Sequence, residues 1–306
     1  MQKISYLGLP NCYRLSNGQV EAVVTTDVGP RILRYGFVGG ENALGEVPEL
    51  SQTTTLGEWK PWGGHRLWAA PEAMPRSYAP DNSPLEYDLE GDRAAINLRQ
   101  PVEAETGIEK ELHVRLEEQT GSLLVRHKIT NRNLWGIVAA PWALTIMHGG
   151  GLAILPQEPY RSHSDYLLPA RPLVMWHYTD LSDPRWRIGK RYVCLRSDPE
   201  RREPQKIGIA NKQGWAAYHR AQMLFVKRFS YEDGATYPDY GCNNEVFTAG
   251  SFIEVESLAP LRHLEPGESV EHSERWYLFG EVELEADEES ALEASISPLI
   301  EQTIAV

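Results

Sequence analysis

Aromatic, basic and acidic side chains are concentrated in one short segment, residues 59–72, which reads WKPWGGHRLWAAPE. Tryptophan faces stack on the C–H faces of sugar rings, while Arg and His side chains donate hydrogen bonds to hydroxyl or carboxylate oxygens. The pair Gly63–Gly64 allows the backbone to approach a ligand closely. The segment therefore indicates a concave pocket for a small polar molecule, although a buried aromatic turn, with the His capping a backbone carbonyl, would have the same composition. Its candidate ligand contacts are Trp62, His65, Arg66, Trp68 and Glu72.

Paired carboxylates occur near the C-terminal end, where residues 251–260 read SFIEVESLAP. Side chains two residues apart in a strand point to the same face, so Phe252, Glu254 and Glu256 share one face and Ile253 and Val255 the other. Two neighbouring carboxylates on one strand are typical of a solvated face. If they lined a cleft instead, each would raise the pKa of the other, which suits a general base.

Three further segments contain side chains of interest. Residues 237–245 read YPDYGCNNE, in which Asn and Asp either face a site or bond to their own turn backbone. Residues 27–34 read DVGPRILR, whose arginines either reach a pocket or form surface ion pairs. Residues 147–151 read MHGGG, in which the His either lines a site or is structural. The candidates from these segments are Arg31, His148, Asp239, Asn243 and Glu245.

Short strand patterns dominate the chain and predict the scaffold. Examples that alternate apolar and polar residues, or are rich in Val, Ile and Thr, are 20–26 (VEAVVTT), 94–98 (AAINL), 109–116 (EKELHVRL), 122–130 (SLLVRHKIT) and 252–258 (FIEVESL). A helical pattern at 288–303 is expected to be interrupted by Pro298. Residues 157–204 are poor in strand pattern and are expected to form long loops. Many short strands with little helix predict an all-β sandwich or barrel.

Composition excludes several classes of protein. The chain of 306 residues is 42% hydrophobic and 24% charged, as expected for a sizeable core, and its net charge of −13 disfavours binding to nucleic acids and anionic membranes. Cys12, Cys194 and Cys242 lack the spacing of a disulfide framework or zinc site. Phosphate-binding glycine loops and metal-binding His spacings are absent from the sequence, so no cofactor or metal is expected. The N-terminus resembles no signal peptide, which leads us to expect a cytoplasmic protein.

Taken in order, six motifs resemble an uncharacterised bacterial family within the galactose mutarotase-like superfamily. They are DVGPRILRYGF, WGGHRLWAAPE, ITNRNLWGIVAAPWALTIM, KIGIANKQGWAAY, YPDYGCNNE and FIEVESLAPLRHLEPGESVEHSERW, and together they extend from about residue 18 to 280. The resemblance implies a β supersandwich of two large antiparallel sheets with few short helices and a sugar-binding cleft. We expect a single domain over residues 1–306, with an acidic C-terminal tail at about 283–306.

The resemblance also implies catalytic roles. In aldose 1-epimerases of this superfamily, a Glu takes the proton of the anomeric hydroxyl and a His protonates the ring oxygen, which opens the ring. The Glu corresponds in position to Glu254, with Glu256 as the other choice. The His would stand on the strand after the Thr-Asn turn at 130–131, where this chain has Trp142, and His148 follows several residues later. His65 is the alternative acid.

Two functions follow from this reading. The chain is either an enzyme on a sugar, such as an aldose epimerase-like isomerase, or a carbohydrate-binding protein without catalysis. In the enzyme, Glu254 and His65 would be base and acid, and Arg31, Arg66 and Lys206 would bind sugar oxygens. In both cases the partner is a small carbohydrate, with no nucleic acid and no membrane. The sequence predicts neither the sugar nor the oligomeric state.

Overall fold

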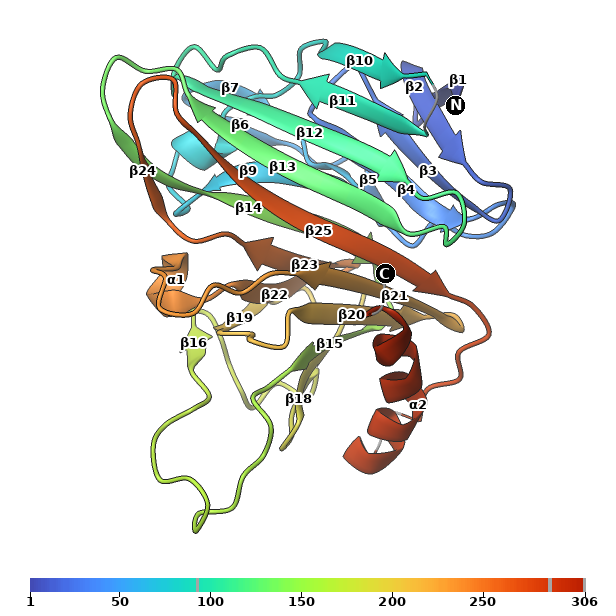
Figure 1. Cartoon of the computed structure of the whole chain (residues 1–306), viewed down its shortest axis with the longest axis vertical. Helices are drawn as coiled ribbons and strands as arrows, with labels where there is room; N and C mark the ends of the chain where they lie inside the picture. The colour runs from blue at the N-terminus through green and yellow to red at the C-terminus, as the bar shows by residue number, and fades with distance from the viewer. Residues whose placement is uncertain (92–93, 286–287, 305–306) are drawn as a thin grey trace.

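Two large antiparallel sheets form the scaffold in the computed structural model, which describes residues 1–91, 94–285 and 288–304 (Figure 1). Within these residues the first sheet has eleven strands, and β24 (Arg262–Leu264) pairs with β14 beside the main path. The main path runs in the order β1 (Gln2–Tyr6), β2 (Leu9–Ser16), β3 (Val20–Thr25), β4 (Arg31–Phe37), β9 (His65–Ala70), β14 (Ile137–His148), β23 (Phe252–Leu258), β22 (Asn244–Ala249), β19 (Gln205–Ile209) and β16 (Leu173–Met175).

The second sheet has ten strands in the described part of the chain. Their order is β10 (Glu86–Glu90), β11 (Ala95–Arg99), β12 (Ile108–Leu116), β13 (Leu123–Asn131), β25 (Ser269–Phe279), β21 (Met223–Phe229), β20 (Trp215–Arg220), β15 (Leu152–Pro156), β18 (Tyr192–Arg196) and β17 (Trp186–Ile188). Two short hairpins lie outside both sheets, pairing β5 (Glu46–Val47) with β8 (Trp62–Gly63) and β6 (Gln52–Thr54) with β7 (Gly57–Trp59). The predicted all-β sandwich is confirmed, and the five expected strand segments correspond to β3, β11, β12, β13 and β23.

The hydrophobic core lies between the two sheets, because alternate side chains of each strand point inward. The buried apolar side chains from both sheets include Leu15, Val24, Ile32, Leu112, Val125, Val255 and Trp276. Tyr35 of the first sheet donates its hydroxyl hydrogen bond across this core, 2.9 Å from the Gly121 carbonyl oxygen and 3.3 Å from that of Trp276. This buried hydroxyl is therefore satisfied across the interface between the sheets.

Little helix accompanies the strands, namely a short helix α1 (Pro238–Gly241), a 3₁₀ turn (Arg76–Tyr78) and α2 (Glu289–Gln302) among the described residues. Helix α2 runs through Pro298, so the expected interruption there is wrong. Its buried side chains Leu292, Ile296 and Ile300 pack on the outer face of the second sheet, where burial of this apolar stripe stabilises the helix. Residues 286–287 and 305–306 of the expected acidic tail lie outside the described residues.

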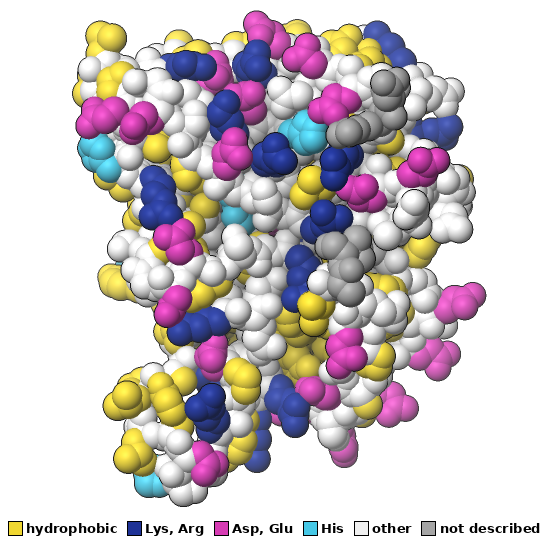
Figure 2. Space-filling model, viewed as in Figure 1, with side chains coloured by type: hydrophobic (Ala, Val, Ile, Leu, Met, Phe, Trp, Pro, Cys, Tyr) yellow, Lys and Arg dark blue, Asp and Glu magenta, His cyan; other side chains and the backbone are white. Residues whose placement is uncertain are grey.

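One segment projects from the sandwich between β15 and β16, at the lower left of Figure 1. The stretch from 157 to 172 contains no strand, as predicted. The rest of the segment 157–204, also expected to form long loops, contains three short strands, β16, β17 and β18, so the prediction is wrong there. Several of its apolar side chains are exposed, and Figure 2 shows apolar groups gathered on this projection; they include Tyr160, Tyr166, Leu167 and Leu168. None of the helices in the described residues is long and apolar enough to cross a bilayer.

The packing of α2 predicts the effect of Ile296→Ala. Because Ile296 is fully buried against the second sheet, its truncation should lower the free energy of unfolding by about 2–4 kcal/mol. Urea denaturation followed by circular dichroism measures this change. Glu301→Ala on the exposed side of the same helix is the control and should stay within about 0.5 kcal/mol. Equal effects of the two substitutions would contradict the packing of α2.

Candidate functional site

Strand β9 separates two groups of polar residues, because adjacent side chains of a strand point to opposite faces. Leu67 belongs to a buried cluster with Ile129 of the second sheet, so the odd-numbered side chains of β9 face the sandwich interior. Arg66 and Trp68 therefore project from the outer face of the first sheet. All six residues of β9 are buried on one face or the other.

Neighbouring strands extend this outer face in register. Leu144 of β14 lies opposite both Arg66 of β9 and Glu256 of β23. Ile146 of β14 lies opposite Glu254. The prediction that Glu254 and Glu256 share one sheet face is therefore correct, and it is the same face as that of Arg66.

A cavity of about 330 Å³ lies on this outer face. Its volume is near the lower end of the range of about 300–1,000 Å³ that is usual for small-molecule pockets. The wall combines apolar and aromatic groups with a few charged ones, as such pockets do. The strands of the first sheet contribute Arg66, Trp68, Trp142, Leu144, Ile146, Lys206, Phe247, Phe252 and Glu254, and the short hairpins and loops contribute Leu50, Ser51, Gln52, Trp59, Pro61, Glu72, Tyr78 and Tyr178.

An ion pair at the wall of the cavity joins Arg66 to Glu254, with 3.0 Å between Nη2 and Oε1. The Arg66 guanidinium also lies over two indole rings, 5.3 Å from the Trp59 centroid and 4.7 Å from that of Trp68. Its Nε and Nη1 atoms have no hydrogen-bond partner among the described residues. Burial raises the pKa of the Glu254 carboxyl above its usual range, and the nearby Arg66 charge opposes that shift.

Lys206 also lines the cavity and is held by two carboxylates and two indoles. Its Nζ lies 2.8 Å from Glu245 and 3.1 Å from Glu256, and 4.7 Å from the ring centroids of Trp142 and Trp176. Burial lowers the pKa of Lys206, but the two carboxylates outweigh burial, so its pKa is well above the usual value. Lys206 is therefore a fixed cation at neutral pH.

Trp142, which occupies the position expected for the acid of the epimerases, has a different role here. Its indole Nε1 donates a hydrogen bond of 2.8 Å to Oε2 of Glu256. Glu256 is fully buried and is absent from the residues that line the cavity. The alternative of Glu256 as the base is thus not supported, because its carboxylate is enclosed by Trp142 and Lys206.

The mouth of the cavity holds a second polar pair. Tyr78 donates its hydroxyl hydrogen bond to Glu72, 2.6 Å from Oε1. The Tyr78 ring packs against Trp59 and Trp68, with centroid separations of 5.3 and 4.8 Å. These two indoles therefore connect the Tyr78–Glu72 pair to Arg66. Trp59, Trp68 and Trp142 are 6%, 5% and 2% exposed, so they form the walls of the cavity and do not offer an open ring face for stacking.

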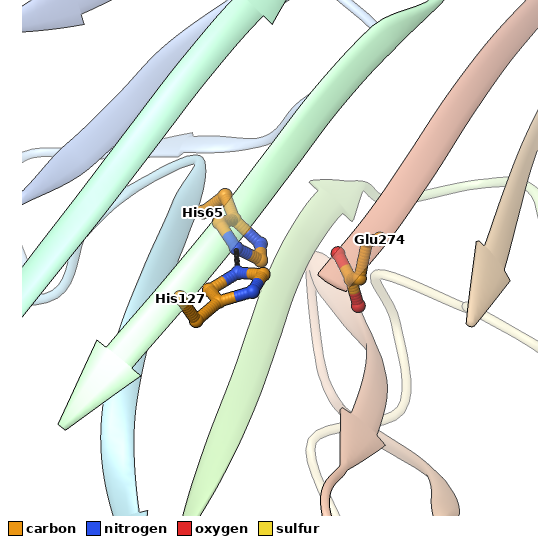
Figure 3. Close-up of side chains that lie close together, drawn as sticks. All are labelled: His65, His127 and Glu274. Atoms are coloured by element: carbon orange, nitrogen blue, oxygen red, sulfur yellow. Dashed lines mark hydrogen bonds between the residues drawn. The ribbon is translucent and has the colours of Figure 1, made fainter. Parts of the chain in front are cut away.

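His65 lies on the opposite face from Glu254, inside the sandwich. It is fully buried, and its Nε2 lies 2.6 Å from Nε2 of His127 on the second sheet. Figure 3 shows the two rings against each other, with the Glu274 carboxylate across from them. The prediction that His65 and Glu254 act across one cleft is therefore wrong, because consecutive residues place His65 and Arg66 on opposite faces.

The interior group has the composition of a metal site, since ligand atoms of His65, His127 and Glu274 all lie within 4.8 Å of one another. The same atoms are nevertheless hydrogen-bonded within the described residues. Glu274 accepts from the Lys227 ammonium at 2.8 Å and from the Trp276 indole at 2.7 Å. Lys227 thus supplies the positive charge beside the Glu274 carboxylate, and the donor set fits a polar network of the core rather than an ion site.

The proton positions in this network follow from its hydrogen bonds. The backbone carbonyl of His272 can only accept, so Nδ1 of His127, 3.0 Å away, carries the hydrogen. Nε2 of His127 then accepts from Nε2 of His65, whose Nδ1 accepts from the Thr145 hydroxyl 2.8 Å away. Burial lowers the pKa of His127 to about 4 and that of His65 well below its usual value, so both are neutral. These histidines stabilise the contact between the sheets.

Five other candidates lie away from the lining of the cavity. Arg31 is buried and bonds to Asp81 at 2.6 Å and to the Pro61 carbonyl at 2.8 Å, which anchors the loops around the cavity. Asn243 bonds to both backbone groups of Asn211. The remaining three are Trp62, which packs against another cluster, His148, at the end of β14, and Asp239, in α1.

The structure therefore brings together Arg66, Trp68, Glu72, Trp142, Lys206 and Glu254 around one cavity, with Glu245 and Glu256 behind it. Sequence reasoning missed Tyr78 and Tyr178. Tyr78 stands in a 3₁₀ turn and Tyr178 in a loop, where no strand periodicity indicates which way a side chain points. For Tyr178, the clustering of aromatic residues in the loop-rich segment 157–204 was the sequence feature that could have indicated a site residue.

Several solved structures share this fold. The Slr1438 protein from Synechocystis sp. PCC 6803 is similar with a TM-score of 0.55 and 13% identity, covering 92% of this chain and all of its own. A galactose mutarotase-like protein from Lactobacillus casei ATCC 334 has a TM-score of 0.56 and 11% identity, covering 88% and 100%. A putative aldose 1-epimerase from Escherichia coli K12 has a TM-score of 0.52 and 13% identity, covering 88% and 99%. No protein-family model matches the sequence, and no curated protein matches it. The chain thus has the galactose mutarotase-like fold.

The buried histidines predict that the free energy of unfolding depends on pH, and His127→Gln should make this dependence weaker. The pKa of His127 is about 4 in the folded protein and about 6.5 in an unfolded chain. Between these values the unfolded chain binds the additional proton, so acidification destabilises the fold by up to about 1.4 kcal/mol per pH unit for each such residue.

Urea denaturation from pH 7.5 to 4 measures this slope. In H127Q the slope of the free energy of unfolding against pH should be smaller than in the unchanged protein by about the contribution of one histidine. His163→Gln, at an exposed position, should leave the slope unchanged. Parallel slopes for H127Q and the unchanged protein would contradict a neutral, buried His127.

Proposed function

We propose that this chain binds a small carbohydrate, about one sugar ring in size, in the cavity on the outer face of the first sheet. The observation that carries the proposal is the buried Arg66–Glu254 pair, whose two members line a cavity of about 330 Å³ with aromatic walls. Sugar hydroxyls both donate and accept hydrogen bonds, so neighbouring hydroxyls complement a carboxylate beside a guanidinium. The fold supports the proposal, because its solved relatives include a galactose mutarotase-like protein and a putative aldose 1-epimerase.

Tyr178 offers the aromatic surface that a bound sugar ring would contact. It lines the cavity and is 41% exposed, unlike the enclosed tryptophans. An accessible aromatic face packs on the apolar C–H face of a sugar. Tyr178 can therefore be removed without opening a hole in the core, which makes it suitable for a binding test.

Tyr178→Ala should weaken sugar binding by about 1–2 kcal/mol, or about 5- to 30-fold in Kd. Isothermal titration calorimetry with D-glucose, D-galactose, D-mannose and D-xylose measures the affinities, and tryptophan fluorescence reports occupancy of the cavity. Tyr160→Ala is the matched control, because Tyr160 is similarly exposed and belongs to the projecting segment. Absence of binding for all four sugars by the unchanged protein would overturn the proposed function, and equal losses in both variants would remove Tyr178 from the site.

A second candidate function is epimerase-like proton transfer, and one observation favours it. Glu254 lines the cavity, and burial raises its carboxyl pKa toward the range of a general base. In such a reaction Glu254 would take the proton of the anomeric hydroxyl. None of the described residues that line the cavity is a histidine. The proton for the ring oxygen would come from another side chain of the wall, for which we propose the hydroxyl of Tyr78 or Tyr178, although burial raises the pKa of both.

For this second function, Glu254→Gln should slow catalysed mutarotation by about 10²- to 10⁴-fold, because the amide cannot accept the proton. Polarimetry of freshly dissolved α-D-glucose and α-D-galactose follows the reaction. Glu271→Gln, at an exposed position of β25 in the second sheet, is the control and should retain the full rate. If the unchanged protein does not accelerate mutarotation beyond buffer, the catalytic function is wrong and the binding function stands on the calorimetry.

A further inference from the structure

The charges around the cavity are compensated by the protein itself. Of the described residues that line it, the cationic ones are Arg66 and Lys206. Glu254 pairs with Arg66, and Glu245 and Glu256 both pair with Lys206. Glu72 adds a further carboxylate at the mouth. The site therefore holds four carboxyl groups beside two cations, and each cation has a carboxyl partner. Burial raises the pKa of the Glu245 carboxyl well above its usual range, so the remaining three supply most of the negative charge.

This arrangement has a consequence for the charge of a ligand. A carboxylate or phosphate that approached Arg66 would come close to the Glu254 carboxylate, because only 3.0 Å separate that carboxylate from Nη2 of Arg66. Like charges repel strongly where water is largely excluded, and both residues are at least nine-tenths buried. Uncharged hydroxyls avoid this repulsion and can bond to both partners of the pair. Selectivity would thus come from a repulsive group placed beside an attractive one.

We propose that Glu254 determines ligand specificity: by occupying Arg66, it restricts the cavity to uncharged sugars and excludes sugar acids and sugar phosphates. This inference rests on the proposed function and adds to it the class of ligand. It also implies that Arg66 would bind an acidic sugar if Glu254 were removed. A guanidinium released from its carboxylate is well suited to bind another carboxylate through two parallel hydrogen bonds.

The test compares each neutral sugar with its acidic counterpart by isothermal titration calorimetry. The probes are D-glucose with D-glucuronate and D-glucose 6-phosphate, D-galactose with D-galacturonate, and D-mannose with D-mannuronate. The unchanged protein should bind at least one neutral sugar, and its acidic forms at least about 10-fold more weakly. In Glu254→Gln, the ratio of uronate affinity to neutral-sugar affinity should rise roughly 10- to 100-fold, as one charge-assisted hydrogen bond would give.

Two control variants isolate the release of Arg66. Glu72→Gln removes one negative charge from the same cavity without freeing a cation, so it should change the ratio by no more than about 3-fold. The double variant E254Q/R66M removes the cation as well and should lose the gain in uronate binding. If E254Q does not fold by circular dichroism, Glu254→Asp weakens the same pair and should shift the ratio in the same direction.

The outcomes separate the two proposals. Uronate or phosphate binding by the unchanged protein as tight as neutral-sugar binding would overturn the role of Glu254 and leave the carbohydrate site standing. An unchanged ratio in E254Q, an equal gain in E72Q, or a gain that persists in the double variant would also overturn it. Absence of binding of every probe by the unchanged protein would overturn the proposed function itself, and this inference with it.

Discussion

The two-residue period of the first sheet is the constraint on which the rest of the structure depends. In β9, β14 and β23 it directs Arg66, Trp142 and Glu254 outward while His65 and Thr145 point into the sandwich. Both faces of these strands are buried, so both contain polar groups that need partners. One short set of strands therefore supports two separate polar networks. The inner network joins the two sheets, and the outer one forms the wall of a cavity.

Charge compensation governs both networks. A buried charge is costly unless a partner and hydrogen bonds stabilise it. Inside the sandwich, Lys227 and Glu274 form a fully buried pair that is surrounded by neutral histidines. Outside, Lys206 lines the cavity but its two carboxylate partners do not, whereas both members of the Arg66–Glu254 pair line it. The inner pair is enclosed by the core, whereas both members of the outer pair face a cavity.

Much of the fold could be predicted from the sequence, because strand alternation is a local property; it located β3, β12, β13 and β23 and placed Glu254 and Glu256 on one face. The face taken by His65 could not be predicted, since all residues of β9 are buried and polarity gives no indication of which face is the core. Arg31 finds its partner Asp81 fifty residues away, a contact that only the tertiary structure reveals. Helix α2 tolerates Pro298 because packing of Leu292, Ile296 and Ile300 outweighs the missing hydrogen bond.

Trp142 stands where the resemblance to the epimerases led us to expect an acid, and the structure gives it another role. An indole N–H donates a hydrogen bond but does not exchange its proton in acid–base catalysis, so Trp142 fixes Glu256 and cannot serve as the acid expected there. Glu256 in turn holds Lys206 in place. Glu254 is then the carboxylate of this strand that faces the cavity, and its partner is a guanidinium rather than an acid. Binding of a sugar needs only these groups as they stand, whereas ring opening needs an additional donor from a tyrosine. This difference in requirements is the physical reason that binding is the function best supported by the geometry.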